Sequence, residues 1–404
     1  MFRRLQLLIL AVVLVVAAFS TGEEFLFFLI YVGLLVGGGS YILTRLGLSD
    51  LEAGYAVSQL SGHVGDRLRV TYTLRNTGRV IKPWLEIHNP TTLPVGLPGR
   101  ALSLRGRQER SWLVRTPLAR RGHFRIEPLQ IRTGDPFGFF EASASVGQGI
   151  TLVVYPRIDA LPLWRLPPAN IEGAHASPER TLQTTPLATT VRPYAPGDSM
   201  NRIHWRSTAK TGEIQVKEFD LEQTADAWLF VDLDAAGEAG SGDESTTEVA
   251  VRAAASIADK AIGENRAVGL TVSAHRMTIL PADRGARQRL KILHLLAAVE
   301  ADGRTPLAEA LVTGVNRLRR GMTAIIVTST HDPAFIRPLA TLRSRGIGAV
   351  VVFLDPAAFE SDPDESGAEV KRQHSRAVRH ALAEYQIPTF VVVPGQDLAV
   401  ALAR

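Results

Sequence analysis

Two apolar runs near the amino terminus constrain the fold of this 404-residue chain more than any other feature. The first covers about residues 5–21, with Gln6 as its one polar interruption before the end, and the second covers about residues 25–43. A helix needs roughly 17–25 residues of this kind to cross the hydrocarbon core of a bilayer. The pattern therefore predicts two transmembrane helices within residues 1–48, joined by the short acidic turn at Thr21–Glu24.

Basic residues flank this pair of runs and indicate its orientation. Arg3 and Arg4 precede the first run, and Arg45 follows the second. Because flanking Arg and Lys residues stay on the cytoplasmic side, we expect a multi-pass protein of the cytoplasmic (inner) membrane, with its soluble domains facing the cytoplasm. The alternative is a cleaved signal peptide ending near Ala17–Ser20. A second apolar run so soon after the first favours the hairpin.

Composition excludes several classes of function. The chain has no cysteine, so disulfides, thiolate catalysis and cysteine zinc sites are absent. A net charge of +5 is too small to indicate nucleic-acid binding, which usually needs one strongly basic face. We therefore expect no nucleic-acid partner. The length predicts two or three domains.

Residues 50–157 have the pattern of short β-strands separated by turns. Apolar and polar residues alternate in Leu68–Leu74, and turn signals such as Asn76–Gly78 and Gly134–Pro136 separate the runs. Further strands are expected at Trp84–His88, Glu109–Arg115, Gly122–Ile126, Leu129–Arg132 and Ile150–Tyr155. Short strands at this spacing predict an antiparallel β-sandwich.

After a proline-rich linker at residues 158–190, the rhythm changes to strands that alternate with helices. The expected strands are β-branched apolar runs at Trp228–Leu233, Val268–Ser273, Ala324–Thr328, Ala349–Leu354 and Thr389–Val393. Helical spacing lies between them, for example in Thr246–Ile262 and Glu369–Tyr385. Residues 191–404 are thus predicted to form a segment of unusual composition followed by a doubly wound α/β domain with a mostly parallel sheet.

The segment Val191–Asp220 is both aromatic and strongly charged. It carries Arg192, Tyr194, Asp198, Arg202, His204, Trp205, Arg206 and Lys210. The spacing R-x-Y-x-x-G-D-x-x-x-x-I-x-W resembles the signature of the "domain of unknown function 58" family. The sequences RRGHF at Arg120–Phe124 and DPFG at Asp135–Gly138 also resemble motifs of that family. The resemblance implies a membrane protein with a von Willebrand factor A-like domain that works with a MoxR-type AAA+ ATPase.

Two interpretations of this signature segment stay open. In the first, its aromatic and basic side chains form a docking surface for a partner. In the second, the segment is structural: Arg192 and Asp198 form an ion pair, and Trp205 fills a joint between domains. Asp198, His204 and Ser207 are also the residue types of a catalytic triad, but a triad is defined by geometry, and we do not expect catalysis.

A magnesium site is the one cofactor site that the sequence suggests. In von Willebrand factor A-like domains the first strand ends in D-x-S-x-S, and a later loop supplies a threonine. Here Asp232 has the first position, Asp234 and Ala236 replace the serines, and Thr305 resembles the loop threonine. Hard oxygen ligands of this kind suit Mg²⁺. The alternative is that both carboxylates cap a helix or remain solvated.

Eight arginines lie between Arg100 and Arg125, and near a membrane they would attract anionic lipid. A solvated strand face is the alternative. The sequence as a whole favours a membrane-anchored interaction or scaffold protein and not an enzyme. The family resemblance implies that this protein works with a MoxR-type ATPase in the assembly or maturation of a cell-envelope complex. The alternative function is a Mg²⁺-dependent ligand-binding module with a degenerate metal site.

Overall fold

The computed structural model describes residues 2–166, 190–195, 198, 200–218, 226–360 and 365–403. Most of the predicted linker, residues 167–189, therefore lies outside the described residues. The chain forms two compact units. The first consists of residues 1–158 with 293–299, and the second consists of residues 159–292 with 300–404.

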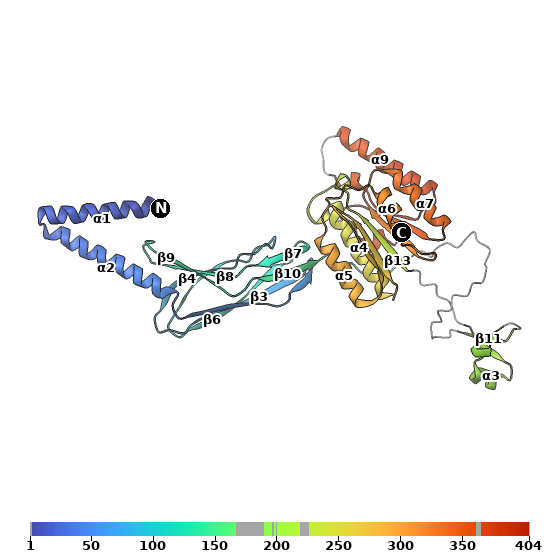
Figure 1. The fold of residues 1–404 in the computed structure, drawn as a ribbon, viewed down its shortest axis with the longest axis horizontal. Helices are drawn as coiled ribbons and strands as arrows, with labels where there is room; N and C mark the ends of the chain where they lie inside the picture. Colours follow the sequence, from blue (N-terminus) through green and yellow to red (C-terminus); the bar gives the residue numbers. More distant parts are fainter. Residues whose placement is uncertain are drawn as a thin grey trace. The chain divides into compact units, whose positions relative to one another are not determined.

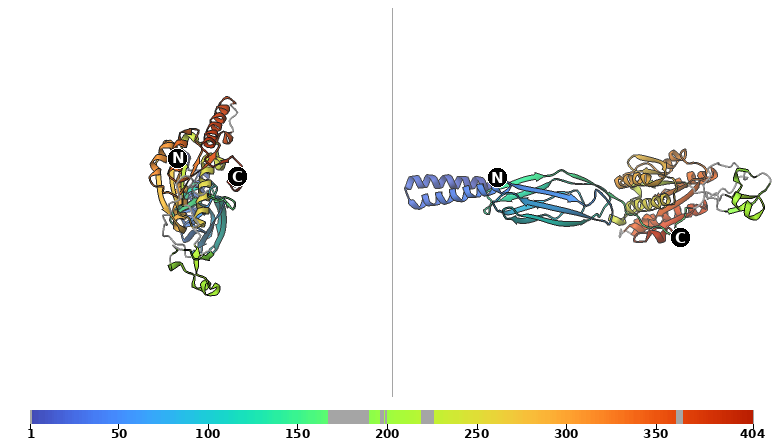
Figure 2. Two further views of the ribbon diagram at one scale, coloured as in Figure 1. Left: turned by 90° about the vertical axis from the view of Figure 1, so that its right-hand side faces the viewer. Right: turned by 90° about the horizontal axis from the view of Figure 1, so that it is seen from below.

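The first unit begins with two helices, α1 (Phe2–Thr21) and α2 (Glu24–Gly47), which run antiparallel and side by side (Figures 1 and 2). The rings of Phe19 and Phe27 meet edge to face at 5.4 Å near their junction. Within the described residues, α2 is the helix that is long and apolar enough to cross a membrane, and α1 has a shorter apolar stretch at Ile9–Thr21. One apolar membrane-length helix is thus confirmed, whereas the two-pass topology and its orientation stay predictions.

The last turns of α2 pack against the β-rich region that follows. Ser40, Thr44 and Gly47 are buried and lie on one face because they are spaced four and three residues apart. A Cβ atom on Gly47 would come within 2.7 Å of the Thr133 side chain, so glycine permits this close approach. The buried ammonium group of Lys82 donates a hydrogen bond to the Leu46 carbonyl at the end of the helix.

Residues 51–155 are all described and form ten strands arranged in three sheets. The strands are β1 (Leu51–Val57), β2 (Ser61–His63), β3 (Arg67–Asn76), β4 (Lys82–His88), β5 (Arg100–Leu104), β6 (Glu109–Pro117), β7 (Gly122–Ile126), β8 (Leu129–Gly134), β9 (Glu141–Val146) and β10 (Ile150–Tyr155). The sheet orders are β1-β3-β6, β2-β10-β7 and β5-β4-β8-β9. All pairings are antiparallel except β2 with β10.

These sheets enclose one apolar core. Alternate residues of β3, Leu68, Val70, Tyr72 and Leu74, point into it with residues from β4, β5, β8 and β10. The alternation that predicted β3 therefore reflects one buried and one solvated face.

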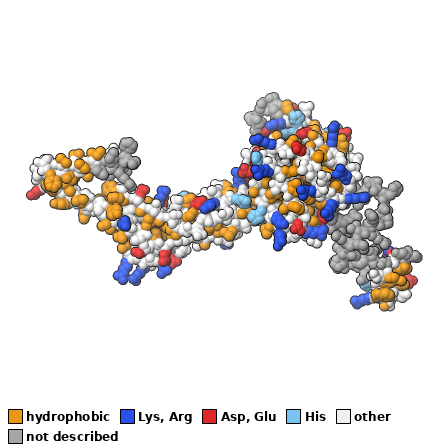
Figure 3. Space-filling model, viewed as in Figure 1, with side chains coloured by type: hydrophobic (Ala, Val, Ile, Leu, Met, Phe, Trp, Pro, Cys, Tyr) orange, Lys and Arg blue, Asp and Glu red, His pale blue; other side chains and the backbone are white. Residues whose placement is uncertain are grey.

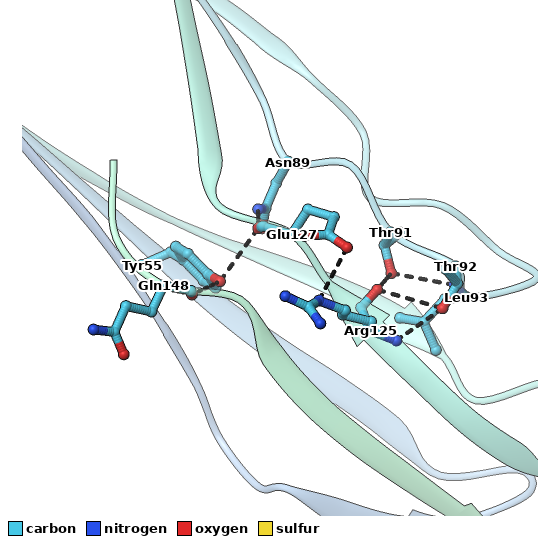
Figure 4. A network of polar contacts seen from close by, with 8 residues as sticks. All are labelled: Tyr55, Asn89, Thr91, Thr92, Leu93, Arg125, Glu127 and Gln148. Atoms are coloured by element: carbon cyan, nitrogen blue, oxygen red, sulfur yellow. Dashed lines mark hydrogen bonds and ion pairs between the residues drawn. The ribbon is translucent and has the colours of Figure 1, made fainter. Parts of the chain in front are cut away.

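A polar network holds the segment between β4 and β5 onto its neighbours (Figure 4). Tyr55 Oη donates to the Gln148 carbonyl at 2.7 Å, and Asn89 Nδ2 donates to the Glu127 carbonyl at 2.6 Å. The Arg125 carbonyl accepts hydrogen bonds from Thr91 and Thr92. The bonds from Asn89, Thr91 and Thr92 thus hold the start of the irregular segment beside β7, where Thr91 forms an isolated bridge with Ile126.

The second unit contains an α/β region built on a six-stranded sheet. Its strands are β13 (Ala227–Asp232), β14 (Val268–Ser273), β15 (Met277–Asp283), β16 (Thr323–Thr328), β17 (Gly348–Leu354) and β18 (Thr389–Val392). The order is β15-β14-β13-β16-β17-β18, and β15 is the one antiparallel edge strand of this sheet. The helices of the region are α4 (Thr246–Gly263), α5 (Gly285–Ala298), α6 (Leu307–Val315), α7 (Ile336–Ser344), α8 (Pro356–Phe359), α9 (Glu365–Glu384) and α10 (Leu398–Ala401), with the 3₁₀ turns η2 (Ala235–Gly237), η3 (Gly242–Glu244) and η4 (Pro333–Phe335). The last residues of α5, 293–298, belong to the first unit.

Helices cover this sheet on both faces. The side chains of α6, α7 and α9 share a buried cluster with alternate residues of β13, β16 and β17, such as Phe230, Ile326 and Val351. The alanine-rich α4 packs along the sheet on the side opposite α6 and α7 (Figure 1). The central strands are buried on both faces, which explains why they read as continuous apolar runs.

The contact at the end of α2 yields the first prediction. Gly47→Ala should lower the free energy of unfolding of the first unit by about 1–3 kcal/mol, because the new methyl group overlaps Thr133. Gly37→Ala is the matched control, since nothing lies within 4 Å of its added Cβ atom. Thermal unfolding of the full chain in detergent measures both. Equal effects from the two substitutions would contradict the close packing described here.

Candidate functional site

The strand order of the α/β region creates a switch point between β13 and β16. The chain continues from β13 toward β14 on one side, and β16 leads to β17 on the other. In open α/β sheets, ligands bind outside the carboxyl ends of the strands at such a point, because the connections diverge and leave a crevice. Asp232 is the last residue of β13, and Thr328 is the last residue of β16.

Asp232 and Thr328 interact directly across this switch point. The Thr328 hydroxyl donates a hydrogen bond of 2.7 Å to Asp232 Oδ2. Asp232 is 3% exposed, and Thr328 is fully buried. Burial raises the pKa of Asp232 to about 6, although the hydrogen bonds from Thr328 and from the Asp234 amide work in the opposite direction. A buried carboxylate at this position is a candidate functional group.

The other two predicted metal ligands lie at the same edge of the sheet. The Asp234 amide donates to Asp232 Oδ1 at 3.3 Å, and Asp234 Oδ1 caps η2 by accepting from the Ala236 amide. Backbone hydrogen bonds tie Gly303 to Leu233 and Ala235, and these bring the loop of Thr305 to the end of β13. The Ser273 hydroxyl, at the end of β14, donates to the Thr305 carbonyl.

The arrangement partly fits a hard cation. Two carboxylates and several hydroxyls gather at one sheet edge, but Ala236 offers no side-chain oxygen, and Asp234 already serves as a cap. Across the described part of the chain, no three His, Cys, Asp or Glu side chains form a metal-binding group. Sequence reasoning missed Thr328 and Ser273 as site residues. The sequence does contain a signal for both, because each is a polar residue at the carboxyl end of an apolar strand.

The signature segment folds into a small structure of its own. Strands β11 (Thr190–Pro193) and β12 (Gln215–Glu218) pair antiparallel, and η1 (Met200–Arg202) and α3 (Trp205–Thr211) lie between them. Arg192 forms two hydrogen bonds of 2.8 Å with the Asp198 carboxylate, which also accepts from the Ala195 amide. The ion pair of the structural interpretation is therefore present, and it holds Asp198 against the end of β11.

His204 has a structural role in this segment. Its Nδ1 atom accepts a hydrogen bond from the Ser207 amide and so caps α3, and the Ser207 hydroxyl lies 2.7 Å from the same nitrogen. Asp198 bonds to Arg192 instead. The described contacts thus show a helix cap and an ion pair and do not link the three residues as a triad.

Several of the segment's apolar side chains are exposed. Trp205 is 69% exposed and Met200 68%, and Val191 and Ile214 are also exposed. The basic residues Arg206 and Lys210 are exposed beside them on α3, and Tyr194 is half-buried. The side chain of Arg202 lies outside the described residues. Exposed large apolar groups on so small a structure are typical of a contact surface.

The buried carboxylate gives a prediction about pH. Because the pKa of Asp232 lies above its ordinary value of 3.8, the folded protein holds this proton more tightly than the unfolded chain does. The protonated carboxyl group of Asp232 therefore contributes its full stabilisation below about pH 4, and this stabilisation is lost as the pH rises to about 6 and beyond. Asp232→Asn should raise the free energy of unfolding at pH 7.5 by about 2–3 kcal/mol in EDTA, and by much less at pH 4.5. Denaturant unfolding of the full chain in detergent at both pH values measures this difference. A variant destabilised more at pH 7.5 than at pH 4.5 would contradict the assignment.

Comparisons with known proteins match this chain to uncharacterised proteins and match part of it to one family model. Uncharacterized protein YeaD of Bacillus subtilis is 26% identical over 372 residues, which cover 88% of this chain and 86% of that protein. Uncharacterized protein Rv1480 of Mycobacterium tuberculosis is 30% identical over 194 residues, covering 46% of this chain and 61% of that protein. Among solved structures, the CARDB domain of the PF1109 protein from Pyrococcus furiosus is 12% identical, with 26% of this chain and 92% of that chain covered and a TM-score of 0.20. Residues 190–375 match the family described as "Protein of unknown function DUF58".

Proposed function

We propose that this protein is a membrane-anchored binding protein whose soluble part faces the cytoplasm, and that its partner is a MoxR-type AAA+ ATPase. The anchor in this proposal is α2, whose apolar surface is almost entirely unburied within the chain. The arginines that flank the helical hairpin support the cytoplasmic orientation. The choice of partner rests on the resemblance of the signature segment to its family.

The α/β region supports a binding role because of its likeness to von Willebrand factor A domains, which we propose as its fold family. Six strands with one antiparallel edge strand, and helices on both faces, agree with that likeness. A sheet of this kind presents its binding edge at the switch point, where Asp232 and Thr328 lie. None of the contacts described there requires a covalent step, and we propose no catalytic activity.

The exposed apolar surface of the signature segment is the observation that carries the proposal. The Arg192–Asp198 pair and the His204 cap hold the segment in a defined shape, and Trp205 and Met200 project into solvent. Tryptophan and arginine dominate the energetics of many protein interfaces. A partner that buries Trp205 and contacts Arg206 and Lys210 would use the segment as its docking surface.

Substitution of Trp205 tests this proposal. Trp205→Ala should reduce co-purification of the ATPase with the full chain from native membranes by at least about tenfold, since a buried interface tryptophan contributes 2 kcal/mol or more. Tyr385→Ala, which removes another exposed aromatic ring from the second unit, is the control. Retention of the ATPase by Trp205→Ala at the level of Tyr385→Ala would exclude the signature segment as the docking surface.

A second candidate function is favoured by the position of Asp232. We propose as an alternative that Asp232, Asp234 and Thr305, with Thr328 and Ser273 nearby, bind Mg²⁺ at the switch point. Oxygen donors suit this ion. When bound, the cation would offer a positive centre to an acidic group of a ligand. The hydrogen bonds already made by both carboxylates weigh against this alternative.

Calorimetry distinguishes this alternative. Titration of Mg²⁺ into the full chain in detergent should give a binding heat that disappears in Asp232→Asn, because a neutral amide binds the ion far less strongly. Asp243→Asn, at an exposed position in η3, should leave the heat unchanged. If the wild-type chain gives no heat, or if both variants retain it, the alternative is excluded.

A further inference from the structure

Two loops of the β-rich region meet the end of α2. The first joins β3 to β4 and the second joins β5 to β6. The Asp50 carbonyl, just after the helix, accepts hydrogen bonds from the amide and hydroxyl of Thr77. The Arg107 amide donates to the Gly78 carbonyl and links the second loop to the first. Both loops are therefore held at the place where α2 ends.

These loops carry exposed basic and apolar side chains together. Arg79, Arg105 and Arg107 are exposed, and among the described residues none of them has an ion-pair partner. Beside them Val80 and Ile81 are 42% and 53% exposed. Figure 3 shows Lys and Arg side chains gathered at the end of the β-rich region that adjoins α2.

The arginine run noted in the sequence is split by the fold. Arg105 and Arg107 lie at the α2 end, whereas Arg121 is buried and donates to the carbonyls of Leu296 and Val299 in the same unit. Arg107 has a φ of 59°, in the left-handed region that glycine or asparagine occupies more readily. The Arg107 side chain thus occupies a position whose backbone conformation favours other residues.

A third loop, residues 135–140 between β8 and β9, reaches back along α2 (Figure 1). The Phe140 ring contacts the Tyr41 ring edge to face at 5.6 Å. Tyr41 lies six residues before Gly47, about 9 Å back along the helix axis at 1.5 Å per residue. The loop therefore extends toward the part of α2 that would be in lipid.

Asp135 holds this aromatic loop in place. Its carboxylate accepts hydrogen bonds from the amides of Phe137 and Phe140 at 2.9 and 2.6 Å. Burial alone would raise the pKa of Asp135, but these amides and the Ser40 hydroxyl on α2 lower it below its ordinary value. Phe137 is nevertheless 60% exposed, with Phe139 stacked on it at 5.7 Å.

We propose that these three loops form a lipid-contact surface on which the β-rich region rests, and that its ligand is a bilayer with anionic headgroups. Phe137 and Phe139 enter the interfacial layer, as aromatic side chains of peripheral anchors do. Arg79, Arg105 and Arg107 bind the phosphate groups of the headgroups. This inference rests on the membrane anchoring by α2 proposed above.

The continuity of the surface with α2 is the argument for lipid as its occupant. The loops are bonded to the first residues after the helix, so a bilayer crossed by α2 brings its headgroup layer to them. Exposed apolar and cationic groups side by side match the acyl and phosphate layers of that boundary. At this end the carboxylates of Asp50, Glu52 and Glu109 are outnumbered by five arginines, because Arg75 and Arg110 lie at the same strand ends as Arg79, Arg105 and Arg107.

The test of the aromatic loop uses the full chain, whose lack of cysteine makes an introduced cysteine a unique labelling site. Phe137→Cys and Leu60→Cys are labelled with an environment-sensitive fluorophore and reconstituted into vesicles that contain brominated phosphatidylcholine and phosphatidylglycerol. Leu60 is 61% exposed and follows β1, which leads away from α2, so it is the matched control. We expect lipid bromine to quench the label at position 137 several-fold more than the label at position 60.

The arginines are tested by the enrichment of a fluorescent phosphatidylglycerol around the protein, measured by energy transfer from the label at position 137. Each arginine near an anionic surface contributes about a fivefold preference. Combined Arg79→Gln, Arg105→Gln and Arg107→Gln should therefore lower enrichment by about tenfold or more. The control combines Arg67→Gln, Arg69→Gln and Arg115→Gln, which remove the same charge from exposed positions nearer the other end of β3 and β6.

The outcomes separate this inference from the proposed anchoring. Equal quenching at positions 137 and 60, or equal enrichment in the two triple variants, overturns the lipid-contact surface. If the full chain also stays in the membrane during alkaline extraction, the proposed anchoring by α2 is unaffected by that failure. Release of the whole chain by alkaline extraction overturns the anchoring as well.

Discussion

The junction at the end of α2 is the contact on which the first unit depends. The helix α2 exposes apolar side chains over most of its length. Only a narrow stripe of small residues, Ser40, Thr44 and Gly47, packs against the β-rich region. The Leu46 carbonyl, which has no partner within the helix, is satisfied by the Lys82 ammonium group. The positive charge also complements the negative end of the helix dipole. The same few residues thus end the helix, begin the sheet and position the loops that carry arginine and phenylalanine.

The second unit depends on a different constraint, its strand order. From β13 the chain continues to β14 on one side of the sheet, and from β16 it continues to β17 on the other side. Strands buried on both faces leave only their ends for polar chemistry, and Asp232 and Thr328 occupy two neighbouring ends. The hydrogen bond between them compensates in part for the burial of the carboxylate. The site is therefore a product of the strand order, while the signature segment presents its surface through a local ion pair and a helix cap.

Local patterns in the sequence predicted most of the elements. The alternation in β3 and the continuous apolar runs of β13, β16 and β17 reveal how many faces of each strand are buried. By contrast, β1 (LEAGYAV) and β9 (EASASV) were not predicted, because small residues such as Ala, Ser and Gly carry little strand preference. Contacts between distant residues were also beyond reach. Asp232 was identified from a motif, but its partner Thr328 lies 96 residues later, and strand order is not encoded in local periodicity.

The burial of Lys82 has a consequence for how the protein is assembled and handled. Its ammonium group is fully covered, and burial lowers its pKa, so it needs the acceptor that the last turn of α2 supplies. A fragment cut just after Gly47 would keep Lys82 beside Ser49 and Asp50, but it would lose the Leu46 carbonyl and the helix turn that covers the ammonium group. The β-rich region therefore depends on the end of α2 to complete the surroundings of one of its buried side chains.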